Sequence, residues 1–399
     1  MDHKRLGAAY KRMAGKICLC VLGITLTAGL WPFHVPANRV EWVGGGNGLE
    51  FGRHGSAVSS GAIRADEPPD ASTTLEIWFQ PACTKGNGTI LTFDGSAHPG
   101  ASFSLHQTED ALSIRRNNVD PQDIARTAVF SVSGILHEKK PVFVTIGLDS
   151  RETSVYVNGV LAHSFSNSRA WNDLTGRIVL ANSPTINDSW TGEIFSLAIY
   201  RQRLTPSEVA ANYASWMTGQ KPTQVAERSA IALYLFDERS GTDVHNKFDP
   251  ATDLIIPAHY FVLHPGFMTA PWQEYRATWS YWLDVGVNVA GFIPFGFCVF
   301  AYFSLARIIK HPGAATILLG FFTSLTIELL QAFLPTRSSG MTDLITNSLG
   351  TAIGVMIWRH PIAQALLESA SAEVGETKSA AASLESSIVM SELTTSNRV

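Results

Sequence analysis

The chain has 399 residues, of which 45% are hydrophobic and only 16% are charged, and its formal net charge is -4 at pH 7. The sequence pI is near 6.3, so no excess of basic residues points to a nucleic-acid partner. The mean hydropathy of +0.08 is high for a soluble protein of this length. These numbers exclude a basic nucleic-acid-binding protein and favour several domains, some of them in a membrane.

The first predicted element is an apolar run at residues 17–33. The basic residues before it are Lys4, Arg5, Lys11, Arg12 and Lys16. A basic start before an apolar core fits either a membrane anchor or a cleaved signal peptide. No small-residue cleavage signature follows, and Trp31-Pro32-Phe33 is typical of an aromatic interface anchor. We therefore expect residues 1–34 to form a cytoplasmic basic N-terminus and a retained transmembrane helix.

Residues 40–257 are predicted to form a soluble domain of short strands. Alternating apolar runs lie at 74–81, 89–93, 101–107, 111–116, 141–149, 153–165, 176–181 and 192–204. Asn158-Gly159 separates two apolar runs, and both residues accept the positive φ of a tight hairpin turn. Many antiparallel strands with such turns predict a β-sandwich or jelly roll. Cys83 is the single cysteine of this domain, so no disulfide within it is expected.

Several segments of this domain resemble the LamG-like, concanavalin A-like jelly-roll family. They are TLEIWFQP (74–81), VYVNGV (155–160) and WTGEIFSLAIYRQRLTPSEV (190–209). The segments 232–246 and 252–257 resemble a further strand pair of such domains, which extends the predicted sandwich to residue 257. The resemblance implies the fold, and it implies carbohydrate binding, in some members with calcium.

Glucanases of this family need paired Glu residues on one strand, because retaining hydrolysis requires a nucleophile and an acid about 5 Å apart. No E-x-D-x-x-E pattern occurs in the chain, so we do not expect glycoside hydrolysis. A sugar site could use outward side chains of Trp171, Trp190, Asn182, Asn187 and Asp188. The simpler interpretation, which we favour, is that these residues form turns and core edges. No cofactor is predicted beyond that calcium ion.

Residues 258–283 are rich in Trp and Tyr and precede an apolar run. Amphipathic rings favour the membrane–water interface, so this segment is predicted to be an interfacial aromatic belt. A ligand-stacking platform is the alternative. Three further transmembrane helices are predicted at about 284–306, 313–334 and 343–358. The polar tail at 359–399 is predicted to be disordered.

Basic residues also mark the ends of these later runs. Arg307 and Lys310 lie between the second and third runs, and Arg359 follows the fourth, whereas the turn between the third and fourth carries only Arg337. The positive-inside rule then places both termini in the cytoplasm and the sandwich outside. The predicted fold is thus an antiparallel β-sandwich inserted into an α-helical membrane bundle of four transmembrane helices.

Polar residues share one face on each of the last three helices. The sets, helix by helix, are Asp284 and Asn288; Ser324, Glu328 and Gln331; Asp343 and Asn347. In the predicted topology all lie within about 9 Å of the outer ends of their helices. Polar side chains at membrane depth face the bundle interior and find partners, so we expect one cluster with Arg337 as counter-charge. Gly350 and Gly354 should let another helix approach closely.

A purely structural role is the alternative for this cluster. The amides would then only join helices, and Asp343 would be a first-turn carboxylate that favours the helix dipole. Glu328 fits that interpretation least, because Gln would join helices without a buried charge.

The same segments carry a second resemblance. DVGVNVAGFIPFGF (284–297) and SLTIELLQAFLPTRSSGMTDLITNSLGTAIG (324–354) resemble the VanZ-like membrane family, named for a protein that gives low-level teicoplanin resistance. The positions that the resemblance implies are functional are Asp284, Asn288, Pro294, Gly296, Glu328, Gln331, Arg337, Asp343, Asn347 and Gly350. The family's mechanism does not follow from the resemblance.

The leading hypothesis is a multi-pass protein of the bacterial plasma membrane. Its outward polar pocket would meet a lipid headgroup or an envelope precursor, its sandwich would recognise envelope glycan, and it would contribute to glycopeptide resistance or envelope handling. A rival hypothesis is a membrane enzyme or proton-coupled carrier that acts on a lipid-linked precursor through Glu328, the candidate catalytic residue. A third is a sandwich anchored by an inert bundle.

Overall fold

The computed structural model describes residues 3–63, 72–95, 101–116, 128–149, 151–166, 174–219, 221–275, 277–307 and 309–361. The chain divides into two compact units. One unit comprises residues 32–266 and 334–338, and the other comprises residues 1–31, 267–333 and the chain from 339 onward. Trp171 and the predicted disordered tail beyond residue 361 lie outside the described residues.

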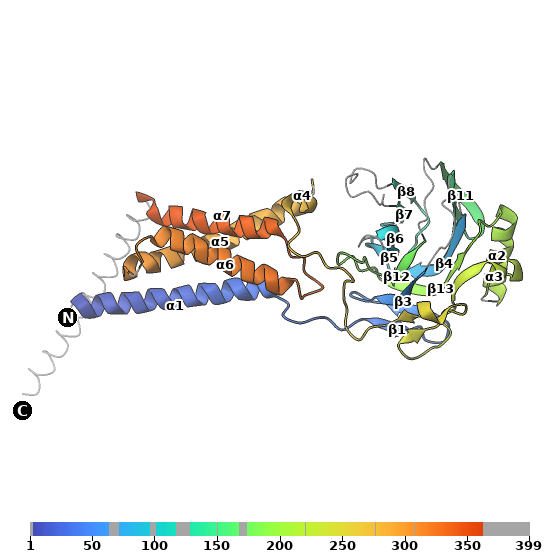
Figure 1. The fold of residues 1–399 in the computed structure, drawn as a ribbon, viewed down its shortest axis with the longest axis horizontal. Coiled ribbons are helices and arrows are strands. Elements are labelled where there is room, and N and C mark those ends of the chain that lie inside the picture. The colour runs from blue at the N-terminus through green and yellow to red at the C-terminus, as the bar shows by residue number, and fades with distance from the viewer. Residues whose placement is uncertain are drawn as a thin grey trace, which may run out of the picture. The chain divides into compact units, whose positions relative to one another are not determined.

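As far as its residues are described, the first unit is a β-sandwich of two eight-stranded sheets in which the strands pair antiparallel (Figure 1). The first sheet has the order β1 (Val40–Trp42), β2 (Leu49–Phe51), β13 (Gly192–Tyr200), β4 (Thr73–Pro81), β9 (Val142–Leu148), β10 (Glu152–Val157) and β11 (Val160–Ser166), with β14 (Ala230–Tyr234) also paired to β13. The second has the order β15 (Asp243–Val244), β16 (Leu254–Ile255), β3 (Ala57–Ile63), β12 (Gly176–Leu180), β5 (Asn87–Asp94), β6 (Ala101–Thr108), β7 (Ala111–Arg116) and β8 (Ala128–Val132). The antiparallel sandwich predicted from the sequence is confirmed.

The core between the sheets follows the period of the strands. Leu75, Ile77 and Phe79 of β4 are fully buried in it, whereas the residues between them face the other side of the sheet. Asn158 and Gly159 have φ values of 50° and 80°, so the predicted hairpin turn joins β10 and β11 as expected.

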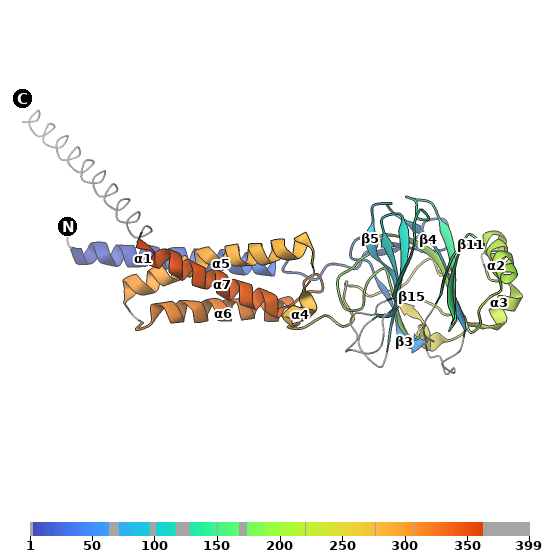
Figure 2. The ribbon, with the colours of Figure 1, turned by 90° about the horizontal axis from the view of Figure 1, so that it is seen from above.

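A second apolar cluster lies on the outer face of the first sheet. There α2 (Pro206–Gly219) and α3 (Gln224–Arg228) cover part of the sheet, as Figures 1 and 2 show. The start of α2 is a capping box, because the Glu208 carboxylate accepts the Thr205 N–H at 2.7 Å and the Thr205 hydroxyl accepts the Glu208 N–H at 3.3 Å. Trp216 of α2 is 1% exposed, so the helix is firmly seated on the sheet.

The segments after α3 differ from the prediction. The expected strand pair divides between the sheets, because β14 adds to the first sheet while β15 and β16 pair beside β3 in the second. Residues beyond 257 also pack on the sandwich: Tyr260 is fully buried and donates to Asn187 Oδ1 at 2.7 Å, and His264 contacts Asp94 at 2.8 Å. Part of the predicted aromatic belt is therefore sandwich structure.

Within its described residues, the second unit contains four long helices and one short helix. They are α1 (His3–Leu30), α4 (Pro271–Glu274), α5 (Trp279–Ala306), α6 (Pro312–Gln331) and α7 (Met341–Arg359). Among the described residues, three segments are long and apolar enough to cross a bilayer, namely Lys11–Leu30, Trp279–Ala306 and Pro312–Gln331. The chain thus has a helical region with membrane-like helices. The fourth predicted span, α7, is not among the three.

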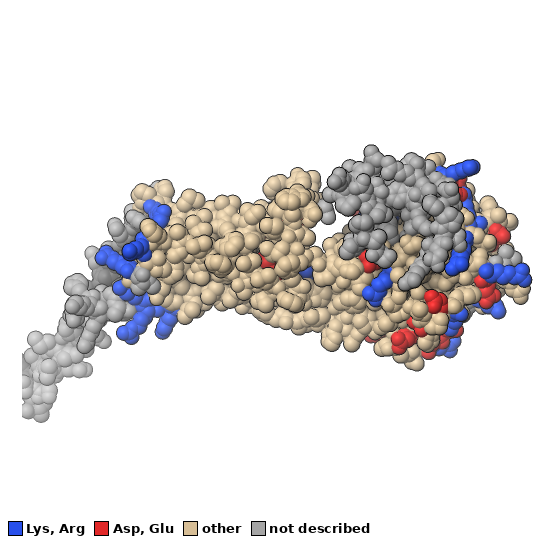
Figure 3. All heavy atoms as spheres, viewed as in Figure 1, with Lys and Arg blue, Asp and Glu red and all other residues tan. Residues whose placement is uncertain are grey.

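The long helices of this unit lie side by side and alternate in direction (Figure 2). Gly15 of α1 lies against Tyr302 near the end of α5, and Gly29 lies against Ile327 near the end of α6. Gly313 at the start of α6 lies against Arg359 at the end of α7. On the face shown in Figure 3, the Lys and Arg side chains of the helical unit gather at one end, and the rest of that face is nearly uncharged.

Candidate functional site

Glu328 lies in the last turn of α6 and is buried, with 1% of its surface exposed. Its Oε2 accepts the backbone N–H of Gly340 at 2.8 Å. Gly340 is the N-cap residue of α7 and has no side chain that could cap the helix. The predicted intramembrane carboxylate therefore contacts the start of the next helix.

Glu274, at the end of α4, supplies the missing cap of α7. Its Oε2 accepts the Thr342 N–H at 3.1 Å, in the first turn of α7, where the helix dipole favours a negative charge. Its Oε1 accepts the Thr269 hydroxyl at 2.5 Å, and a Cβ at position 340 would overlap the same oxygen. Two carboxylates, those of Glu274 and Glu328, thus contact or crowd the single residue Gly340.

A short backbone pairing holds Glu274 in place. Thr269 forms a parallel bridge with Gly340: its N–H donates to the Ser339 carbonyl at 3.2 Å, and its carbonyl accepts the Met341 N–H at 2.9 Å. The segment before α5 is therefore fixed to the segment before α7. The sequence does not point to Glu274, because this residue lies in the Trp- and Tyr-rich segment 258–283, which is typical of an interfacial belt and shows no helical or strand period.

Two of the predicted polar stripes meet between α5 and α7. Asn288 donates from Nδ2 to Asp343 Oδ1 at 2.7 Å, and both side chains are half-buried. The third stripe joins them through Asn347, which donates from Nδ2 to the Ser324 hydroxyl of α6 at 2.9 Å. The structure therefore brings Asn288, Ser324, Asp343 and Asn347 together as predicted.

Gln331 connects α6 to α1 instead. Its Nε2 donates to the Gly29 carbonyl at 2.8 Å. A carbonyl oxygen only accepts, so this bond fixes which end of the Gln331 side-chain amide is the nitrogen. The buried Oε1 of Gln331 has no hydrogen-bond partner among the described residues. The buried Oδ1 of Asn347 also lacks a partner in that part of the chain. Unsatisfied buried acceptors are rare in proteins and mark a place where a donor would bind favourably.

Two predicted site residues lie differently. Asp284 is exposed near the start of α5 and takes no part in the bonds that join Asn288 to Asp343 and Asn347 to Ser324. Arg337 lies in the turn 334–338, which groups with the sandwich unit. Its pairing with Glu328 or Asp343 stays a prediction.

Small residues bring α5 and α7 into close contact. A Cβ at Gly350 would overlap the Val289 carbonyl, one at Gly354 would overlap the Ile293 carbonyl, and one at Gly296 would overlap the Thr351 carbonyl. The predicted close approach at Gly350 and Gly354 is confirmed. This tight packing holds Asn288 and Asp343 at a fixed separation.

The sandwich residues considered for sugar binding are engaged within the fold. Trp190 is 2% exposed and donates to Gln107 Oε1 at 2.6 Å, and Asn182 is fully buried. Asp188 accepts the Thr89 hydroxyl at 2.5 Å and contacts His106 Nε2 at 3.1 Å. An outward orientation of Trp190 and Asn182 is therefore wrong, because their polar atoms complete the core edge. Among the described residues, no three His, Cys, Asp or Glu side chains gather in a way that could hold a metal ion.

Family models match two parts of the chain. Residues 36–210 match the concanavalin A-like lectin/glucanases superfamily, and residues 214–364 match the VanZ/LLP1 family. The second match begins within α2 and includes strands of the sandwich unit, so its start differs from the structural division at residue 266. A search of curated proteins found no match.

Solved structures of low similarity cover about half of the chain. The receptor binding domain of botulinum neurotoxin D is 14% identical over 46% of this chain and 48% of that chain, with a TM-score of 0.36. A candidate carbohydrate binding protein from Bacteroides ovatus is 13% identical over 52% of this chain and 57% of that chain, with a TM-score of 0.38. The chain spans about half of the length of each. By its two family matches, the chain combines a concanavalin A-like sandwich region with a VanZ/LLP1-type region, as its sequence predicts.

Proposed function

We propose that this protein is a multi-pass protein of the bacterial plasma membrane with four transmembrane helices and both termini in the cytoplasm. The sandwich is inserted between the first and second of these helices and lies outside the cell. The 19 residues of α7 span about 28 Å, close to the roughly 30 Å hydrocarbon core, which supports α7 as the fourth span. The gathering of basic side chains at one end of the helical unit (Figure 3) supports the orientation.

Its helical unit binds a lipid headgroup or a lipid-linked envelope precursor. The observation that carries this proposal is the approach of Glu274 and Glu328 to the same residue, Gly340. On the same two helices as Glu328 and Gly340, the buried Gln331 Oε1 and Asn347 Oδ1 are acceptors without donors among the described residues. A site rich in acceptors favours a ligand that presents N–H or O–H donors, such as an ammonium group or sugar hydroxyls.

Native mass spectrometry of the full chain in nanodiscs made from bacterial lipid extract tests this proposal. The wild-type protein should retain a defined lipid species, and Glu328→Gln should release it while the protein keeps its apparent melting temperature. Thr326→Val, an exposed position on the same helix, is the matched control and should retain the lipid. Equal lipid retention by Glu328→Gln and the wild type would contradict the proposal that the lipid binds beside Glu328.

The sandwich recognises envelope glycan in this proposal, and the protein contributes to glycopeptide resistance. The lectin-like family match supports the first part, and the VanZ/LLP1 match supports the second. Expression in a susceptible host should raise the teicoplanin concentration that the cells tolerate, and Glu328→Gln should abolish the increase. An unchanged tolerance on expression of the wild-type chain would contradict the resistance role.

A proton-coupled carrier or membrane enzyme that acts through Glu328 is the second candidate. The burial of Glu328 in the last turn of α6 supports this candidate, because an ionisable side chain in a membrane helix is costly unless it has a function. Proteoliposomes with an imposed pH gradient would distinguish the candidates. Proton flux that depends on a lipid-linked precursor and is lost in Glu328→Gln would favour the carrier, and no flux would favour binding alone.

A further inference from the structure

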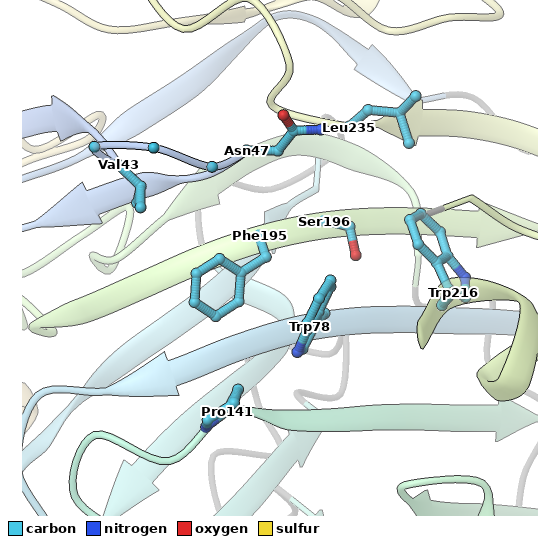
Figure 4. A pocket seen from close by; sticks show the side chains of 11 residues that line it. Val43, Asn47, Trp78, Pro141, Phe195, Ser196, Trp216 and Leu235 are labelled. Atoms are coloured by element: carbon cyan, nitrogen blue, oxygen red, sulfur yellow. The ribbon is translucent and has the colours of Figure 1, made fainter. Parts of the chain in front are cut away.

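The outer face of the first sheet carries a pocket next to α2. Its volume is about 280 Å³, just below the range of ligand pockets, which is roughly 300–1,000 Å³. Figure 4 shows Trp78 from β4 and Phe195 from β13 side by side, with Trp216 of α2 across from them and Asn47 at the rim. This face is opposite to the core between the sheets, and the pocket lies in the sandwich unit alone.

Local backbone features create the aromatic floor. The pairing of β13 with β4 shifts between Ile194 and Ser196, and such a bulge allows the extra residue, Phe195, to face outward. The rings of Phe195 and Trp78 lie with centroids 5.1 Å apart at 55°, and both are half-buried. Gly48 has a φ of 141°, and a Cβ there would lie 3.0 Å from Phe195, so the loop 44–47 closes over the ring only with glycine at 48.

A buried carboxylate fixes the wall of the pocket. Glu76, two residues before Trp78 on the same face of β4, is 1% exposed. Its Oε2 accepts the Trp216 indole N–H at 3.0 Å, the Tyr200 hydroxyl at 2.7 Å and an Asn212 N–H at 2.5 Å. Glu76 is therefore a positioning residue for Trp216, and it does not face the pocket.

The chemistry of the lining selects the class of ligand. None of the lining residues is charged, so the pocket favours a neutral group. The rings of Trp78 and Phe195 that line the pocket favour an apolar surface. The Trp78 indole N–H has no acceptor among the described residues. At the rim, Asn47 Oδ1 already accepts a hydrogen bond from Arg239 at 3.4 Å, so the side-chain amide N–H group of Asn47 is the part that can donate to a ligand. A neutral ring with an apolar face and a hydroxyl edge fits both the aromatic rings and the two N–H donors.

We infer that this pocket binds one neutral sugar ring, whose C–H face packs on Trp78 and Phe195 and whose hydroxyls bond to Asn47 and the Trp78 indole N–H. The inference rests on the proposed function, in which the sandwich recognises envelope glycan. It assigns that recognition to the outer face of the first sheet, beside α2, and away from the loop that holds Asn182 and Asp188.

The test uses the full chain in nanodiscs on an array of neutral oligosaccharides and peptidoglycan fragments, followed by calorimetry with the strongest array ligand. Phe195→Leu and Asn47→Ala should each weaken binding about tenfold, as expected for an aromatic anchor and its polar partner. Phe248→Ala, at an aromatic residue of the sandwich that is 43% exposed and outside the pocket, is the matched control and should bind as the wild type does.

The outcomes separate the two proposals. Suppose that the wild type binds a glycan and that both pocket variants bind it equally well with unchanged melting temperatures. The pocket is then not the glycan site, and the sandwich binds the glycan at another place. If the wild type binds no glycan on the array, the glycan part of the proposed function fails and this inference fails with it. Asn47→Ala keeps the test decisive if Phe195→Leu unfolds, because Asn47 lies at the rim outside the core.

Discussion

The Glu328 carboxylate on α6 accepts the backbone N–H of Gly340 at 2.8 Å and so connects the end of one predicted membrane helix to the start of the next. Both groups are buried, so neither has water as an alternative partner. Replacing Glu328 by Ala leaves this N–H unpaired, which costs about 1–3 kcal/mol. Glu328→Gln keeps an acceptor. We therefore expect a lower apparent melting temperature for Glu328→Ala than for Glu328→Gln in detergent, and equal values would contradict the role of this bond.

Gly340→Ala should destabilise the helical unit, because the new Cβ overlaps Glu274 Oε1. The Glu274 side chain can move away from the new Cβ, so the cost is mainly the loss of the cap of α7, about 0.5–2 kcal/mol. Gly286→Ala in α5 is the matched control, since a Cβ there meets nothing within 4 Å. Thermal unfolding in detergent measures both. A Gly340→Ala protein as stable as Gly286→Ala would show that Glu274 does not hold this position.

Glu76 predicts a pH dependence of the sandwich. Burial raises its pKa above the ordinary value of 4.5, although hydrogen bonds from Asn212, Tyr200 and Trp216 act in the opposite direction. The folded state then binds the proton more tightly than the unfolded state, so the contribution to stability is full below about pH 4.5 and decreases as the pH rises toward the folded pKa.

Glu76→Gln should remove this part of the pH dependence, because Gln does not titrate. Thermal unfolding of the full chain from pH 4 to 8 gives the comparison, and the stability difference between the wild type and Glu76→Gln should change with pH. A constant difference across the range would mean that Glu76 keeps one protonation state.

The proposed topology predicts which positions a membrane-impermeant maleimide reaches. Ser240 lies in an exposed turn of the sandwich, and His311 lies in the exposed connection between α5 and α6. In a chain whose four native cysteines are Ser, Ser240→Cys should react in intact cells and His311→Cys only after permeabilisation. The reverse pattern would invert the orientation.

The sequence predicted those features that carry a short-range period. The alternating strands β4 and β13 and the turn at Asn158 follow from side-chain alternation and from φ preferences, and both were found. The strands β1 and β2 were missed because three residues are too few to show a period. The start of α5 was placed too late, because Trp279 and its neighbours were assigned to an interfacial segment although they are helical.

The polar cluster was predicted in part. The sequence placed Asn288 and Asp343 at the same predicted membrane depth and each on the polar face of its helix. Polar side chains in a helical bundle face the bundle interior, and there these two residues form a hydrogen bond. The bond from Thr342 to Glu274 joins residues 68 positions apart and depends on the backbone bridge at Thr269, which no local pattern encodes. The inward orientation of Trp190 also depended on a distant partner, Gln107.

The bridge between Thr269 and Gly340 has a mechanical consequence. The segment that carries Thr269 and Glu274 is the stretch of chain that follows the sandwich unit, which ends at residue 266. A tension applied to the sandwich, for example through a bound polymer, would travel along this covalent stretch to the cap of α7 and to Gly340. Glu328 of α6 contacts the same residue, so in the proposed topology a pull on the sandwich would reach the surroundings of Glu328 through Gly340.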